Sequence, residues 1–141
     1  MVTNNSEMGK KQKNSTKNGT LNPEEERREI RKVIFYRLAS GREPVRAWLR
    51  RLDMSCRKAI GEDLFTLQLG WPVGMPLTRK IEAGLWELRS TIPGGIARIM
   101  FTEDKGLLIL LHGLIKKSQK LPVSDLALAR RRLVSIRAGR K

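Results

Sequence analysis

The sequence has little of the residue types on which most enzymes and exported proteins depend. It contains one cysteine (Cys56), one histidine (His112) and one tyrosine (Tyr36) in 141 residues, and only 5% of the chain is aromatic. A lone cysteine excludes an intramolecular disulfide, and together with a lone histidine it cannot build the usual Cys/His zinc site within one chain. A two-histidine ribonuclease mechanism is excluded on the same count. We therefore expect a reducing, cytoplasmic location.

Long apolar runs and clustered acids are scarce as well. The longest apolar run, Leu107 to Ile115, is interrupted by His112 and is shorter than the ~20 residues of a membrane-spanning helix. The first 20 residues lack the apolar stretch of a secretory signal. The acids are scattered over separate predicted elements, which disfavours metal-dependent phosphoryl transfer. We expect no membrane segment, no metal and no cofactor.

What the sequence does have is positive charge. Its 29 Lys and Arg residues face 14 Asp and Glu residues, for a net charge of +15. Six of the bases and five of the acids lie in residues 1–29, so residues 30–141 carry 23 bases and nine acids. Residues 1–29 are polar and are predicted to be a disordered or frayed extension, whereas residues 30–141 form the folded domain. Such an excess of positive charge indicates a polyanionic partner.

The residue pattern of this domain predicts a strand, two helices, three strands and a helix. A β-branched and aromatic run is typical of a strand, apolar residues at helical spacing indicate the helices, and alternation with a period of two indicates the later strands. In order, these elements are Val33–Tyr36, Glu43–Leu52, Ser55–Leu69, Leu85–Arg89, Ile96–Phe101, Leu107–Leu114 and Pro122–Arg137. The pattern predicts an α+β fold, with a small antiparallel, possibly mixed, sheet of about four strands. Two N-terminal helices cover one face, and a C-terminal helix closes the fold.

Alternation also sorts the middle strand into two faces. Ala97, Ile99 and Phe101 form the apolar face, which is expected to meet the helix pair. Arg98 then lies on the opposite face, where a long cation is unusual without an anion nearby. Glu87 and Arg89 of the preceding strand share that face. Glu87 either orients Arg89 by ion pairing or makes an ordinary surface pair.

The strongest chemical signal is a cluster of cations directly after the last strand. It consists of Lys116, Lys117, Gln119 and Lys120. If it turns back over the sheet towards Arg98, it forms a cationic site suited to a phosphodiester, because arginine holds a pair of phosphate oxygens and both cations stabilise extra negative charge. A lysine among other cations has a lowered pKa and can serve as a general base. Solubilising cations or simple phosphate contacts are the alternative interpretation.

Three other residues are open to chemical or structural interpretations. His112 lies in an apolar strand and is expected to be a hydrogen-bonded imidazole rather than a proton-transfer group. Cys56 falls on the inward face of a helix and is expected to be buried rather than nucleophilic. Trp71, next to Pro72, either stacks on a nucleic-acid base or caps a loop.

Three stretches carry a family resemblance: Gly84-Leu-Trp-Glu-Leu-Arg89, Ala97-Arg-Ile99, and Leu111-His-Gly-Leu-Ile-Lys-Lys-Ser-Gln-Lys-Leu-Pro122. Together they resemble the phage-derived, HigB-like branch of the RelE/ParE toxin superfamily, over roughly residues 33–137. The resemblance implies a RelE-like fold and the toxin of a type II toxin–antitoxin pair. Such toxins are metal-independent endoribonucleases that cut mRNA on the ribosome, with a 2′-hydroxyl attacking its own 3′-phosphate.

The resemblance also implies roles for particular residues. Arg89, Arg98, Lys116 and Lys117 match the catalytic cations, with Arg98 as phosphate binder and the lysines as proton-transfer groups. RNA contacts are expected from Lys120, Gln119, Lys80 and Arg79. One departure is that Tyr36 is the only tyrosine, so none near the C-terminus is available to stack on the scissile nucleotide.

The partners implied are mRNA, the ribosome and a helix-turn-helix, HigA-like antitoxin in a hetero-oligomer. Two alternatives stay open. One is a non-catalytic, basic module that binds nucleic acid or ribosomes, and the other is a degenerate toxin that retains only antitoxin binding.

Overall fold

The computed structural model describes residues 30–116 and 120–139. Predictions for residues 1–29, Lys117 and Gln119 lie outside the described residues, and the division between an extension and a folded domain stays a prediction. The described residues from Arg31 onward belong to one compact unit. Within the described ranges, no helix combines the length and the apolar character that crossing a membrane requires.

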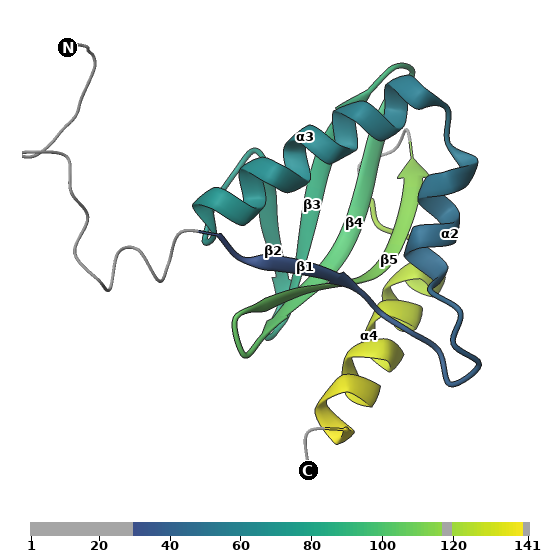
Figure 1. The fold of residues 1–141 in the computed structure, drawn as a ribbon, viewed down its shortest axis with the longest axis vertical. Helices are drawn as coiled ribbons and strands as arrows, with labels where there is room; N and C mark the ends of the chain where they lie inside the picture. Colours follow the sequence, from purple (N-terminus) through teal and green to yellow (C-terminus); the bar gives the residue numbers. More distant parts are fainter. Residues whose placement is uncertain (1–29, 117–119, 140–141) are drawn as a thin grey trace, which may run out of the picture. The chain divides into compact units, whose positions relative to one another are not determined.

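This unit contains five strands and three helices (Figure 1). In chain order they are β1 (Lys32–Phe35), α2 (Pro44–Arg51), α3 (Met54–Gly70), β2 (Thr78–Glu82), β3 (Leu85–Ile92), β4 (Gly95–Asp104), β5 (Leu107–Lys116) and α4 (Val123–Ala138). The α+β class is confirmed, and each predicted helix and strand is present with slightly different ends.

The sheet has one strand more than the predicted four. Its order is β1-β5-β4-β3-β2, with β1 parallel to β5 and the other neighbours antiparallel. The additional strand is β2, which follows Pro76 and has Ile81 as its only large apolar residue, so the sequence resembles a continuing loop. Pairing with β3 makes it a strand, with an irregularity between Lys80 and Glu82.

Two apolar clusters cover the two faces of the sheet. On the face of α2 and α3, the buried core includes Ala97, Ile99 and Phe101, as the alternation predicted. On the face of α4, it includes Met100 and Leu111. Figure 1 shows α3 and α4 on opposite sides of the sheet. Because both faces are covered, a polar side chain in the middle of either face must find its partner within the protein.

Helix α4 is held to the sheet by polar contacts as well as by its apolar face. Arg130 forms a bidentate pair with Glu82 of β2, with nitrogen–oxygen distances of 2.7 and 2.9 Å, and this hydrogen bonding lowers the pKa of the Glu82 carboxyl. Arg132 Nη1 donates to the backbone oxygen of Leu111 at 2.7 Å. Arg132 therefore turns towards the sheet and ties α4 to β5.

Two glycines give a matched test of packing. A Cβ atom on Gly113 of β5 would lie 2.5 Å from the Trp48 ring, whereas one on Gly61 of α3 would meet nothing within 4 Å. We expect Gly113→Ala to destabilise the protein by about 1–3 kcal/mol through overpacking. Gly61→Ala should stabilise it by about 0.5–1 kcal/mol, because alanine loses less backbone freedom in a helix. Urea unfolding measures both, and equal midpoints for the two variants would contradict this packing.

Candidate functional site: an arginine cluster on the α4 face

Four charged side chains from three neighbouring strands share one face of the sheet. Arg79 of β2 pairs with Glu87 of β3 in the ladder, and Arg89 of β3 pairs with Arg98 of β4. Since directly opposed residues point to the same side, and so do residues two apart in a strand, all four lie on the α4 face. We call Arg79, Arg89 and Arg98 the arginine cluster.

Glu87 lies at the centre of this cluster. Its carboxylate oxygens are 3.3 Å from Arg79 Nη2, 4.0 Å from Arg89 Nε and 3.9 Å from Arg98 Nη1. The Glu87 side chain has no solvent exposure, whereas those of Arg79 and Arg89 are 41% and 21% exposed. Among the described residues, neither Glu87 oxygen accepts a hydrogen bond. The attraction to the arginines is therefore a charge interaction in a dry environment, where such interactions are strong.

The charge balance of the cluster favours an anionic ligand. Three guanidinium groups surround one carboxylate, so the site keeps an excess of positive charge. Arginine presents planar, bidentate donors that match phosphate oxygens. Arg79 and Arg89 are exposed enough to present those donors to a phosphodiester.

Arg98 was expected to bind the phosphate, but its side chain is buried beneath the surface of the cluster. Its side chain is 1% exposed, and the anion that a mid-sheet cation requires is Glu87 on the neighbouring strand. Arg98 therefore lies beneath Arg79 and Arg89, where it holds the carboxylate on which all three arginines converge. It can add to the field that a phosphate experiences without direct contact.

The other predicted site residues are more dispersed. Lys116 is the last residue of β5 and is paired with Ile96 of β4. Ile96 lies two positions before Arg98 in β4, so Lys116 is on the same face of the sheet as Arg98. Lys120 is exposed just before α4. Lys80 has its ammonium 5.9 Å from the ring of Trp86, a residue of the α2/α3 face, so Lys80 lies on the face opposite Arg79 and outside the arginine cluster.

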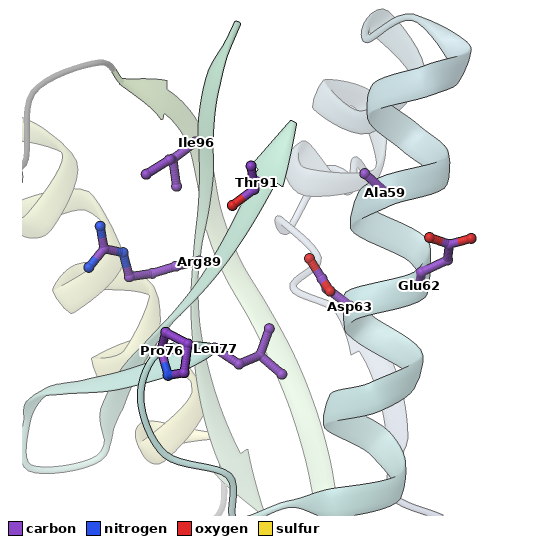
Figure 2. Close-up of a pocket in the computed structure, with 8 residues that line it drawn as sticks. All are labelled: Ala59, Glu62, Asp63, Pro76, Leu77, Arg89, Thr91 and Ile96. Atoms are coloured by element: carbon purple, nitrogen blue, oxygen red, sulfur yellow. The ribbon is translucent and has the colours of Figure 1, made fainter. Parts of the chain in front are cut away.

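A cleft of about 490 Å³ adjoins the arginine cluster. It lies beside the C-terminal part of β3, which β2 does not cover. Its lining includes Asp63 of α3, Leu77, Arg89 and Thr91, which Figure 2 shows around the end of the strand. Asp63 was not among the residues that the sequence pattern singled out as a candidate site. The residue that could have pointed to it is Ser90, a polar residue on the core face of β3. Ser90 is fully buried and donates a hydrogen bond to Asp63 Oδ2 at 2.6 Å.

The three ambiguous residues have structural partners. His112 Nε2 lies 2.6 Å from Asp125 Oδ1, linking β5 to α4. Cys56 is buried, and burial together with the hydrogen bond to Asp53 raises the pKa of its thiol, which disfavours the nucleophilic thiolate. Trp71 contacts Trp86 and Phe101 edge-to-face, with ring centroids 5.1 and 5.2 Å apart. It therefore caps the core. Across the described ranges, no group of three or more His, Cys, Asp or Glu residues could hold a metal ion.

Fold and site together define a small, basic α+β protein with three arginines around a buried carboxylate on one face of its sheet. The family model for the phage-derived protein Gp49-like (DUF891) matches residues 47–134, from within α2 to within α4. The chain therefore belongs to this Gp49-like family, a RelE/toxin-like family that implies an antitoxin partner. No curated protein matches the sequence.

Proposed function

We propose that this protein is the toxin of a type II toxin–antitoxin pair and that it is a ribosome-dependent endoribonuclease of the HigB-like kind. The observation that carries the proposal is the arginine cluster. Its three arginines lie on three adjacent strands around Glu87, and two of them, Arg79 and Arg89, are exposed. The chain belongs to a toxin-like family. This placement suits a single phosphodiester better than an extended duplex, which is bound through phosphates along a longer basic surface.

In the proposed reaction, mRNA is both nucleophile and substrate. A general base removes the proton of a ribose 2′-hydroxyl, and the oxygen attacks the adjacent phosphorus. The P–O5′ bond breaks, and a general acid protonates the leaving oxygen. The products are a 2′,3′-cyclic phosphate and a 5′-hydroxyl. Arg89 and Arg79 stabilise the pentacoordinate phosphorane, Arg98 supports them from beneath, and Lys116 or Lys117 transfers the protons. Lys120 and Gln119 contact the RNA.

The alternative of a basic RNA- or ribosome-binding module without catalysis has one observation in its favour. Arg98, the expected phosphate binder, is buried against Glu87, as a purely structural arginine would be. In both cases RNA binding weakens steeply with salt. Only catalysis creates new RNA ends.

The partner we propose is a cytoplasmic helix-turn-helix antitoxin of the HigA-like kind, forming a hetero-oligomer with the toxin. Its inhibitory segment would offer acidic groups to the arginine cluster or displace α4. Expression with and without the product of the neighbouring gene separates an active toxin from a degenerate one, since only an active toxin arrests growth when alone.

Product chemistry tests the proposal directly. On induced expression, we expect growth arrest and new mRNA ends that carry a 5′-hydroxyl and a 2′,3′-cyclic phosphate. The 5′ ends are mapped by ligation with an RNA ligase that accepts only 5′-hydroxyl groups. The cyclic ends are recognised because they block 3′ adapter ligation until they are opened enzymatically. Intact mRNA during growth arrest would instead favour the non-catalytic alternative.

A further inference from the structure

The cleft beside β3 has the features of a base-recognition site. β2 pairs with β3 only as far as Leu88, and the N–H of Arg89 donates to the backbone oxygen of Leu77 at 2.8 Å. Beyond that bond, in the described part of the chain, no strand pairs with the outer edge of β3 at Thr91. Thr91 also lines the cleft, so the cleft lies beside an edge of β3 that no described strand covers.

The cleft is continuous with the arginine cluster through Arg89. This residue lines the cleft and is also one of the arginines around Glu87. Figure 2 shows its guanidinium leaving β3 on the side opposite Asp63. Because β2 does not pair with β3 beyond Leu88, a nucleotide whose phosphate is held by Arg89 on one side of the strand can pass around this edge and place its base in the cleft on the other side. The apolar side chains of Leu77 and Ala59 suit the flat face of a base.

One carboxylate is held in position to read the edge of that base. Ser90 donates to Asp63 Oδ2 at 2.6 Å, and the described residues make no hydrogen bond to Oδ1. Asp63 points from α3 towards the strand, whereas the neighbouring Glu62 points away (Figure 2). An ionised carboxylate only accepts hydrogen bonds, so it favours a base edge that carries an amino group.

We propose that this cleft binds a base next to the scissile phosphate and that Asp63 selects adenine, cytosine or guanine against uracil. The first three bases carry an exocyclic amino group that donates to Asp63 Oδ1, as acids accept from cytosine N4. Uracil has no exocyclic amino group, and its one donor on the same edge, the N3–H, lies between two carbonyl oxygens that repel the carboxylate. The inference rests on the proposed function, because it assumes RNA at the arginine cluster.

Asp63→Asn is the informative variant. The amide keeps an oxygen that accepts from Ser90, so the fold is retained, and it adds a donor for a uracil carbonyl. Glu103→Gln is the matched control, because it also removes one acid outside the cleft. Ile96 of β4 lines the cleft, and Glu103 lies seven residues further along the same strand, roughly 23 Å away. Thermal unfolding of both variants verifies that they fold.

Sequencing of cleaved transcripts is the first measurement. For the wild type and Glu103→Gln, we expect uracil to be depleted about tenfold at one fixed position beside the cut. For Asp63→Asn, we expect most of this depletion to disappear, so that cuts beside uracil become about as frequent as cuts beside the other three bases. The same base distribution for wild type and Asp63→Asn would overturn the proposal.

A binding measurement distinguishes this proposal from the proposed function. If the wild type cuts no RNA, the nuclease proposal fails, but base selection can still be tested by binding. Fluorescence anisotropy measures the affinity for hexamers of A, C or U at one fixed salt concentration. About tenfold weaker binding of the U hexamer by the wild type, with equal binding of all three by Asp63→Asn, supports base selection. Equal binding of the three hexamers by the wild type overturns it.

Discussion

Glu87→Ala should destabilise the protein by about 3–5 kcal/mol, because it removes the carboxylate from a buried ion cluster. Glu87 is fully buried and Arg98 is 1% exposed. Without Glu87, three guanidinium groups repel one another, and one of them cannot reach water. Domains of this size typically have a free energy of unfolding of only about 5–15 kcal/mol. The expected loss is therefore a large fraction of the total stability. Urea unfolding followed by circular dichroism measures the loss.

Glu82→Ala is the control for this prediction. Glu82 also pairs with an arginine, Arg130, but its side chain is 37% exposed. An exposed pair contributes at most about 1 kcal/mol. A double variant, Glu87→Ala with Arg98→Met, should recover part of the lost stability, because a buried apolar side chain replaces the buried charge. Equal unfolding midpoints for Glu87→Ala and Glu82→Ala would show that the cluster is not a buried charge network.

Arg89→Ala should reduce mRNA cleavage by roughly 100- to 1000-fold, the usual effect of removing one group that stabilises transition-state charge. The side chain of Arg89 is 21% exposed, and its Nε lies 4.0 Å from Glu87. Its removal leaves Glu87 beside Arg79 and Arg98, so the unfolding midpoint should change far less than in Glu87→Ala. Growth after induction and the yield of cyclic-phosphate ends measure the loss.

Arg42→Ala is the matched control for charge. Arg42 is exposed, lies before α2 and is outside the arginine cluster, yet its removal lowers the net charge by the same amount. If cleavage depended only on general attraction to RNA, both variants would lose activity to a similar extent. Full cleavage by a folded Arg89→Ala variant would remove Arg89 from the proposed mechanism.

The faces of the central strands could be predicted because alternation is a local property. Ala97, Ile99 and Phe101 lie in the core with α2 and α3, and Arg98 lies on the other face, as expected from a period of two. The same logic placed Glu87 and Arg89 beside Arg98. It could not show that Glu87 binds three arginines, since that depends on the register of β2, β3 and β4.

Other features were hidden because they depend on contacts distant in sequence. β2 has the composition of a loop and is a strand only because β3 offers its edge. Lys80 and Arg79 are adjacent cations that pairing places on opposite faces. Asp63 is distinguished from other helix acids only by its bond to Ser90, 27 residues away.

The sequence by itself determined the helices and most strands, the two faces of the central strands and the excess of positive charge, because periodicity and composition act over a few residues. Only the tertiary structure decided which charges meet. The pairing of three strands surrounds a buried carboxylate with arginines. Because β2 begins only opposite Leu88, the rest of the outer edge of β3 stays uncovered by β2, and the cleft lies beside it. Such contacts join residues far apart in the chain, so their energies depend on register and burial that no local pattern records.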